Sequence, residues 1–436
     1  MVKCENFEQT ITRFLKMRVF KFGGASVKDA EAIRNVARII KKYENDPLLV
    51  IISAMGKTTN ALEKILSEFI NKDKAYEQSI ANLKKWHFDI LDELYDGNDP
   101  SAQHQLEDLF LQFEWFFELG ETENYDFLYD QIVGFGEIFS TKIIATYLQS
   151  AGIKAKWLDA RNFIITNDNY REAAVDFKLT ESMVQRKLPE ILEDEIIITQ
   201  GFIGKNRMGH ATTLGREGSD FTAAIFAWAL NAKEATIWKD VPGVMNADPR
   251  KFNDTVLFKE LSYRDAVEMS YYGASVLHPK TMQPLQNRGI PLNVRSFVNP
   301  DDTGTTVSAD IPQQTEIPVF IAKENQCLVS IASNNFSFIA EHNLSTIFNA
   351  IAQSRVKINL MRNSAMRFTF CTDNDERKLN VLKTALEPEF NLEIKPDLRL
   401  LTARNANSET RNKLIAEYDV LLEQRIERVR QYVVKA

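Results

Sequence analysis

Residues 18–27 read Arg-Val-Phe-Lys-Phe-Gly-Gly-Ala-Ser-Val, and this stretch decides the fold. Its first half, RVFKF, is the apolar run of a buried strand, and a helical pattern follows through about Lys42. Between them, Gly23 and Gly24 let the backbone approach a ligand, and free N–H groups at a helix start favour an anion. Lys21 adds a positive charge. The string indicates an anion site, although a plain glycine turn also accounts for it when taken alone.

Further along the chain, short apolar runs alternate with helical patterns. The runs are LLVIISA (48–54), KAKWLDA (154–160), EIIITQGFIG (195–204) and ATIWKDV (235–241). Buried strands alternating with helices predict an α/β fold with a mostly parallel sheet and helices on both faces. We expect this unit to cover residues 18–310. Residues 62–129 lack strand signals and are expected to be a helical excursion, either plain packing or a lid over the substrate side.

A second pattern follows a joint rich in Pro, Asp and Thr at residues 299–318. Residues 327–404 show the order β-α-β-β-α-β, which predicts an α+β ferredoxin-like unit. Its first strand is CLVSIAS (327–333) and its last is FNLEIKPDLRLLTAR (390–404). The closing stretch is expected to form a short helix and two strands, DVLLEQR (419–425) and RVRQYVV (428–434). We therefore expect a C-terminal region at 320–436.

Composition excludes several classes of function. The 436 residues carry a formal charge of −7, which does not favour nucleic acid or an anionic membrane surface as a partner. No apolar run is long enough for a membrane span. The three cysteines, Cys4, Cys327 and Cys371, have neither disulfide nor zinc spacing, which suits a reducing, cytoplasmic location. Residues 1–17 are expected to be an N-terminal extension.

Two further strings carry chemistry. TTLGREGSD (212–220) ends at the start of a helix, where Arg216 can grip a carboxylate or phosphate and Ser219 or Asp220 can cap the helix. WKDVPGVMNADPR (238–250) follows a strand, and loops at the carboxyl ends of parallel strands form the ligand crevice. Gly56-Lys57-Thr58 is not a P-loop, because Ile51 stands where the motif needs a glycine.

Six strings in this order resemble the aspartate kinases: KFGGASV, SAMGKTTNAL, VGFGEIFS, TTLGREGSD, WKDVPGVMNADPR and YYGASVLHPKT. The resemblance covers about Arg18 to Thr305. It implies the amino acid kinase fold, a three-layer α/β sandwich without a P-loop, followed by ACT regulatory units. It also implies transfer of the ATP γ-phosphoryl group to the side-chain carboxylate of L-aspartate, giving 4-phospho-L-aspartate for lysine, threonine and methionine synthesis.

The resemblance also implies roles for individual residues. Lys21 would contact the transferring phosphate and Asp220 would orient Lys21. Residues implied to line the phosphate path or bind the nucleotide are Gly23, Gly24, Lys239, Asp240, Met245 and Arg250. Residues implied to lie on the substrate side are Ser53, Thr59, Glu137, which would receive the ammonium of aspartate, and Arg216, which would hold its α-carboxylate. Magnesium would enter through ATP phosphates and water, with no protein metal cage.

The sequence departs from the family's pattern at two places. Glu217 stands where many relatives have a glycine. Family members usually carry two ACT units, whereas the residues after 404 suffice only for a reduced second unit. We therefore expect a homodimer joined through about Cys327 to Lys435, with weak feedback inhibition by an amino-acid effector, lysine or threonine. Two alternatives remain: another carboxylate or nucleotide kinase of the same fold, and a catalytically silent ACT amino-acid sensor.

Overall fold

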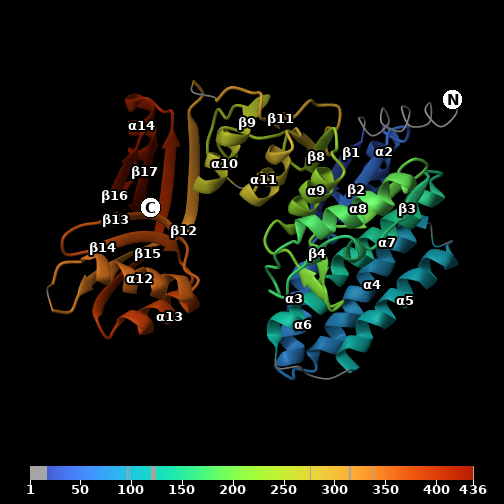
Figure 1. Ribbon diagram of the computed structural model, residues 1–436, viewed down its shortest axis with the longest axis horizontal. Coiled ribbons are helices and arrows are strands. Elements are labelled where there is room, and N and C mark those ends of the chain that lie inside the picture. Colours follow the sequence, from blue (N-terminus) through green and yellow to red (C-terminus); the bar gives the residue numbers. More distant parts are fainter. Residues whose placement is uncertain are drawn as a thin grey trace. The chain divides into compact units, whose positions relative to one another are not determined.

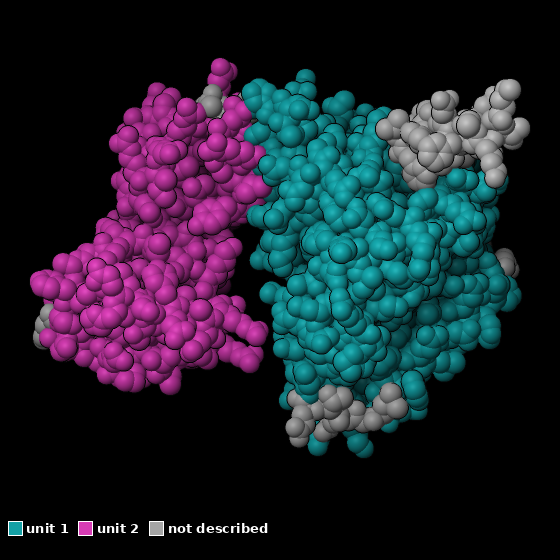
Figure 2. Space-filling model, in the orientation of Figure 1, with its two compact units in different colours: residues 1–244, 257–263, 277–312 teal, residues 245–256, 264–276, 313–436 magenta. Residues whose placement is uncertain are grey.

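The computed structural model describes residues 17–435, except 96, 98, 119–123, 275, 314–315 and 336. Residues 1–16 of the expected extension lie outside this part of the chain. The chain forms two compact units, and neither is continuous in sequence (Figure 2). Unit 1 comprises Met1–Val244, Leu257–Tyr263 and Leu277–Pro312, and unit 2 comprises Met245–Val256, Arg264–Val276 and Gln313–Ala436. None of the described helices is long and apolar enough to cross a membrane.

Unit 1 is built on an eight-stranded sheet with the order β3-β5-β2-β1-β8-β10-β11-β9. Figure 1 labels β1, β2, β3, β8, β9 and β11 of this sheet. Its strands are β1 (Arg18–Phe22), β2 (Leu48–Ile52), β3 (Ala155–Trp157), β5 (Ile196–Gln200), β8 (Glu234–Lys239), β9 (Glu260–Ser262), β10 (Leu292–Ser296) and β11 (Thr305–Ser308). Only β10 and β11 pair antiparallel among these neighbours. Every residue of β2 and of β5 is buried, as expected for strands covered on both faces. The predicted mostly parallel α/β sheet is confirmed.

The helices of unit 1 form layers on both faces of the sheet. They are α2 (Ala30–Lys41), α3 (Thr58–Ile70), α4 (Ala75–Tyr95), α5 (Pro100–Glu118), α6 (Tyr125–Val133), α7 (Phe135–Ser150), α8 (Phe177–Ile191), α9 (Gly218–Ala229) and α11 (Pro279–Asn287), with short 3-10 turns η1 (Gly24–Val27) and η2 (Ala160–Asn162). Side chains alternate along a strand. Phe20 and Phe22 enter the core shared with α2 and α7, whereas Lys21 points to α9. Lys21 thus directs its charge toward α9, away from the core shared with α2 and α7.

A smaller sheet of unit 1 was not predicted from the sequence. It has the order β4-β6-β7, formed by β4 (Ile165–Thr166), β6 (Ile203–Asn206) and β7 (Ala211–Thr213). The stretch 195–204 was expected to be one strand, but it contributes to two sheets. Phe202 lies between β5 and β6 with φ of 69°, in the left-handed region that reverses an extended chain. The hydrophobic pattern does not reveal such a break.

Unit 2 contains a six-stranded antiparallel sheet with the order β13-β14-β12-β15-β17-β16. The strands are β12 (Val319–Ser333), β13 (Ile358–Asn363), β14 (Phe368–Asp373), β15 (Phe390–Arg404), β16 (Asp419–Ile426) and β17 (Val429–Lys435). The helices are α12 (Glu341–Gln353), α13 (Glu376–Leu386) and α14 (Ser408–Ile415), and α10 (Tyr263–Tyr272) enters this unit after its first residue. The predicted order β-α-β-β-α-β is present from β12 to β15. However, β12 begins at Val319 rather than Cys327, because its first half pairs with the second half of β15.

Candidate active site

A buried carboxylate held by two lysines forms the centre of the site. Lys21 Nζ lies 2.6 Å from Asp220 Oδ1, and Lys239 Nζ lies 3.2 Å from Asp220 Oδ2. The three residues come from β1, the first turn of α9 and the end of β8. Burial raises the pKa of Asp220, but the charges of Lys21 and Lys239 outweigh it and hold that pKa below its usual value. The cluster carries a net positive charge at the carboxyl ends of adjacent parallel strands.

The glycine turn after β1 lies beside this cluster. A Cβ on Gly24 would lie 2.7 Å from the Ala54 carbonyl oxygen, so only glycine fits this approach of two backbones. A Cβ on Gly23 would lie 3.5 Å from Lys21 Nζ. Ser53, at the end of β2, donates its N–H to the Phe22 carbonyl at 3.1 Å. The ends of β1 and β2 therefore form one backbone-lined surface next to an ammonium group, which can accept an anion such as a phosphate.

Glu137 supplies a second carboxyl group, in the first turn of α7. It is 3% exposed, and its Oε1 accepts a hydrogen bond from the Ala54 N–H at 3.3 Å. Its Oε2 has no hydrogen-bond partner among the described residues. Burial raises the pKa of Glu137 to about 8, against the opposing effects of the Ala54 N–H and Lys21. A buried carboxylate with an unused oxygen is suited to receive a cationic group of a ligand.

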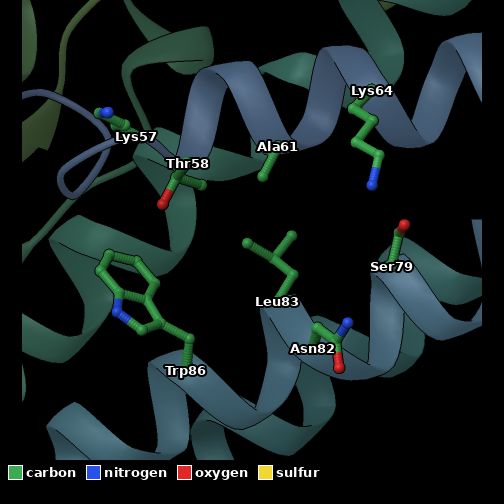
Figure 3. Close-up of a pocket in the computed structure, with 8 residues that line it drawn as sticks. All are labelled: Lys57, Thr58, Ala61, Lys64, Ser79, Asn82, Leu83 and Trp86. Carbon is green, nitrogen blue, oxygen red and sulfur yellow. The ribbon is translucent and has the colours of Figure 1, made fainter.

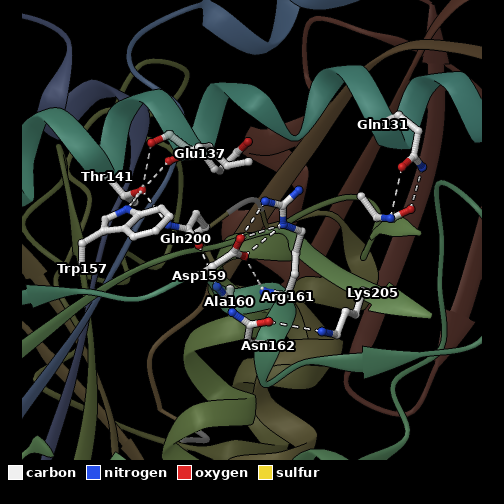
Figure 4. Close-up of polar contacts among 12 residues, drawn as sticks. Gln131, Glu137, Thr141, Trp157, Asp159, Ala160, Arg161, Asn162, Gln200 and Lys205 are labelled. Carbon is white, nitrogen blue, oxygen red and sulfur yellow. Dashed lines mark hydrogen bonds and ion pairs between the residues drawn. The ribbon is translucent and has the colours of Figure 1, made fainter. Parts of the chain in front are cut away.

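A buried network fixes the helix that carries Glu137 (Figure 4). Thr141 lies one turn after Glu137, and its Oγ1 donates to the Glu137 carbonyl at 2.8 Å. The same oxygen accepts hydrogen bonds from Gln200 Nε2 at 2.7 Å and from Trp157 Nε1 at 2.9 Å. Gln200 also accepts the Ala160 N–H at 2.7 Å. This network ties α7 to the ends of β3 and β5, so it sets the position of Glu137 over the sheet.

The loop between β7 and α9 carries Arg216. Its side chain is exposed and makes no hydrogen bond or ion pair within the described part of the chain. The next residue, Glu217, is the N-cap of α9 with φ of 57°, a left-handed conformation that glycine adopts at lower cost. A Cβ on Gly201 would lie 2.4 Å from Ser219 Cβ, so this glycine allows the start of α9 to pack on the chain after β5. Asp220 pairs with lysines and Ser219 packs against Gly201, so the capping role considered from sequence falls to neither.

Comparison with known proteins identifies the family. The model of the amino acid kinase family matches residues 16–296. The lysine-sensitive aspartokinase 3 of Escherichia coli is 32% identical over 81% of this chain and 78% of its own length. The crystal structure of E. coli aspartokinase III in complex with aspartate and ADP has a TM-score of 0.82 and 27% identity, covering 96% of each chain. The chain belongs to the amino acid kinase family. Its relatives place it among the aspartokinases, as the six strings predicted.

Relatives of this family differ in length. The bifunctional aspartokinase/homoserine dehydrogenase 2, chloroplastic, of Arabidopsis thaliana is 29% identical over 85% of this chain but only 42% of its own length. The chain thus spans less than half of that bifunctional relative and more than three quarters of the E. coli relative. The family match and the fold cover Lys21, Glu137, Arg216 and Asp220 alike.

The structure places the remaining site residues of this amino acid kinase in different environments. Thr59 lies in the first turn of α3, directly after the turn at residues 55–57, and Asp240 is exposed next to Lys239. Met245 and Arg250 belong to unit 2, where the Arg250 guanidinium pairs with Asp248 at 2.9 Å. The expected nucleotide-binding roles of these two residues therefore stay predictions. His278 caps α11, since its Nδ1 accepts the Lys280 N–H at 3.2 Å.

Sequence reasoning missed Asp130, a fully buried carboxylate on α6. Its oxygens accept the Thr213 N–H at 2.9 Å, the Thr213 hydroxyl at 2.7 Å and the Arg171 N–H at 3.0 and 3.1 Å. Burial raises the pKa of Asp130 to about 6, although these hydrogen bonds lower it. Asp130 stands seven residues before Glu137, and Thr213 stands three before Arg216. The available signal was an acidic residue within the mostly apolar stretch FLYDQIVGFG, which directly precedes Glu137.

Proposed function

We propose that this protein is an aspartate kinase that transfers the γ-phosphoryl group of ATP to the side-chain carboxylate of L-aspartate. The observation that carries the proposal is the Lys21–Asp220–Lys239 cluster beside the Gly23-Gly24 turn, with the buried Glu137 carboxyl close enough to interact with the charge of Lys21. A carboxylate substrate is already ionised at neutral pH, so no general base is required. The reaction needs instead that two anions approach each other, and fixed positive charges lower that barrier.

Each side of the site has a part in this proposal. Lys21 stabilises charge on the transferring phosphoryl group, and Asp220 holds Lys21 in place. Gly23, Gly24 and Lys239 take the nucleotide phosphates, with Asp240, Met245 and Arg250 on the nucleotide side. Ionised Glu137 receives the substrate ammonium, while Ser53, Thr59 and Arg216 contact the rest of aspartate. These contacts orient the substrate carboxylate toward the γ-phosphoryl group, which is the main contribution an enzyme makes to this chemistry.

Magnesium enters this proposal on the nucleotide. Both oxygens of Asp220 are held by lysines, so this carboxylate is not suited to bind a metal directly. A hard cation that keeps most of its waters would instead be held through ATP beside Gly23, Gly24 and Lys239, where it would neutralise phosphate charge. The residues present fit that arrangement.

Regulation and assembly form the finer part of the proposal. We assign residues 320–436 to a regulatory region with one complete ACT unit, from β12 to β15, and a reduced second unit that includes α14, β16 and β17. The E. coli relative is called lysine-sensitive, which supports an amino-acid effector, lysine or threonine, for this chain. A homodimer and a cytoplasmic location complete the proposal.

The test is trapping of the acyl phosphate. With ATP, Mg²⁺ and hydroxylamine, the full chain should convert L-aspartate to aspartyl hydroxamate, and L-glutamate and N-acetylglutamate should give much less. Lys21→Ala should lose turnover by about a hundredfold or more, since a charge on the transferring group is lost. Lys28→Ala removes an exposed lysine nearby and should leave turnover unchanged. Equal turnover with glutamate would overturn the assignment of aspartate as the substrate. An inactive wild-type chain that still binds lysine would favour the alternative of a catalytically silent ACT amino-acid sensor.

A further inference from the structure

A cavity between α3 and α4 in unit 1 is not used by the proposed reaction. Its volume is about 280 Å³. Figure 3 shows Leu83 and Trp86 of α4 facing Ala61 and Thr58 of α3, with Lys64 and Ser79 at the other end. The volume lies just below that of pockets for drug-sized ligands, so the cavity fits a smaller molecule. Its middle is apolar and its end is polar.

Two observations indicate the charge and polarity of a ligand. Among the described residues, Lys57 and Lys64 line the cavity and no acidic residue does. Ala61, Leu83 and Trp86 make its middle apolar, so a ligand needs an apolar body there. Lys64 pairs with Glu68 at 3.3 Å, and the side chain of Lys64 is 68% exposed while that of Glu68 is 14% exposed. An ammonium group has three N–H donors, so Lys64 can keep this pair and also contact a ligand carboxylate.

The cavity is linked through Trp86 and Gly56 to the glycine turn after β1, which carries Gly23 and Gly24. A Cβ on Gly56 would lie 3.5 Å from Trp86 Cη2, so the indole packs directly against this residue. Gly56 in turn donates its N–H to the Gly24 carbonyl at 3.1 Å. A ligand that moves the indole therefore acts on the turn that carries Gly24. All of these residues lie in unit 1.

We propose that this cavity is a binding site for a small monocarboxylate with an aromatic or branched apolar body, and that its occupancy alters nucleotide binding at the Gly24 turn. The apolar body packs on Ala61, Leu83 and Trp86. The carboxylate faces the Lys64 ammonium, with Ser79 and Asn82 beside it. The cavity and the nucleotide site are coupled because the ligand favours one arrangement of the Gly24 turn over another.

The experiment measures binding of 3-phenylpropionate to the full chain by isothermal titration calorimetry, without substrates, so its outcome is independent of the proposed kinase reaction. We expect a dissociation constant on the order of a few millimolar, as fits a ligand of about eleven heavy atoms. The uncharged 3-phenylpropan-1-ol should bind about three- to fivefold more weakly. Lys64→Gln should reduce the affinity for the acid to that for the alcohol, and it should leave the affinity for the alcohol unchanged.

Lys85→Gln is the matched control. Lys85 is exposed on α4 and pairs with Asp89 four residues on, as Lys64 does with Glu68, but it lies outside the cavity. It should not change the affinity for either probe. Equal binding of acid and alcohol, equal losses in the two variants, or no binding up to about 20 mM would each overturn the site. If the acid binds but the KM for ATP shifts less than about twofold at saturation, the coupling to the turn is wrong.

Discussion

At the scale of single residues, the candidate site depends on carboxyl groups whose pKa values are moved in opposite directions. Asp220 and Glu137 are both buried, at 1% and 3% exposure. Two lysine ammonium groups keep the pKa of Asp220 low, whereas burial dominates at Glu137 and raises its pKa to about 8. Asp220 is thus a permanent anion that positions lysines, while Glu137 gains or loses its charge near the pH of the cell.

This difference gives the first prediction, a pH-dependent KM for aspartate. Ionised Glu137 attracts the substrate ammonium and protonated Glu137 does not, and the ionised form is populated as pH rises through about 8. From pH 7 to about 8.5 its ionised fraction rises roughly eightfold, so the KM for aspartate should fall by a similar factor. Initial rates across this range check it. In Glu137→Gln the KM should be high and flat, and a KM independent of pH in the wild type would contradict the assignment.

At the scale of elements, Asp130 connects α6 with the end of β7. It contacts Thr213 three residues before Arg216, and α6 leads directly into the helix that carries Glu137. Two groups proposed to hold the substrate therefore share one buried anchor. Asp130 itself is a positioning residue, because its hydrogen bonds fix the elements that carry Glu137 and Arg216.

The second prediction is that Asp130→Asn raises the KM for aspartate severalfold while kcat changes by less than about twofold. An asparagine amide presents a donor where the carboxylate accepted one of three donors, so the end of β7 must shift. Steady-state kinetics with each substrate varied check the split. Asp126→Asn is the control, since Asp126 lies on the same helix and, within the part of the chain that the structure describes, pairs only with the Arg171 side chain, at 3.4 Å. A fall in kcat with unchanged KM would contradict the positioning role.

The third prediction concerns His87, which packs α4 against α5 and α7. Its ring is fully buried between Phe110 and Phe139, with centroids 5.7 and 5.4 Å away, and its Nδ1 bonds the Leu83 carbonyl. Burial lowers the pKa of His87 to about 4, so the neutral ring contributes stability above pH 6.5 that is lost as pH falls toward 4.

Urea unfolding at different pH values measures this loss. Between pH 7.5 and 5 the wild type should lose about 2 kcal/mol more unfolding free energy than His87→Leu. The reason is that His87 binds a proton more readily in the unfolded chain than in the folded one, and leucine binds none. The exposed His104 on α5 gives a control, since His104→Leu should follow the wild type. If the unfolding free energies of the wild type and His87→Leu changed equally with pH, the neutral state of the buried His87 ring would be contradicted.

How much of the fold and of the candidate site can be predicted from the sequence depends on how far apart in the chain the interacting residues lie. The Gly23-Gly24 turn, the parallel strands and the order β12 to β15 could be predicted because they depend on local pattern. The Asp130–Thr213 contact joins residues 83 apart in sequence. The Lys21–Asp220 pair joins β1 to α9, two elements that come together only because β8 lies next to β1 in the sheet. The breaks at Phe202 and Glu217 depend on backbone conformations that residue type does not specify.

At the scale of the whole molecule, the sheet of unit 2 has two open edges, β13 and β16. Unpaired strand edges invite pairing with another chain unless they are interrupted. Register irregularities occur in β13 between Ile358 and Leu360 and in β16 between Val420 and Leu422. Such bulges disfavour simple continuation of the sheet. Side-chain contacts across β16 are therefore the better basis for the proposed dimer.

The last prediction locates that dimer. β16 exposes Val420, Leu421 and Ile426 at 36%, 36% and 45%, an apolar set that a partner chain would cover. Light scattering of the full chain should give twice the 49.9 kDa of one chain. Leu421→Lys should weaken the dimer about tenfold or more, because it places a charge in a dry contact. Met361→Lys makes the same change on β13, at a residue 48% exposed, and should leave the mass unchanged. If instead only Met361→Lys gives monomers, the joint lies at the β13 edge, and if neither does, the dimer forms outside this sheet.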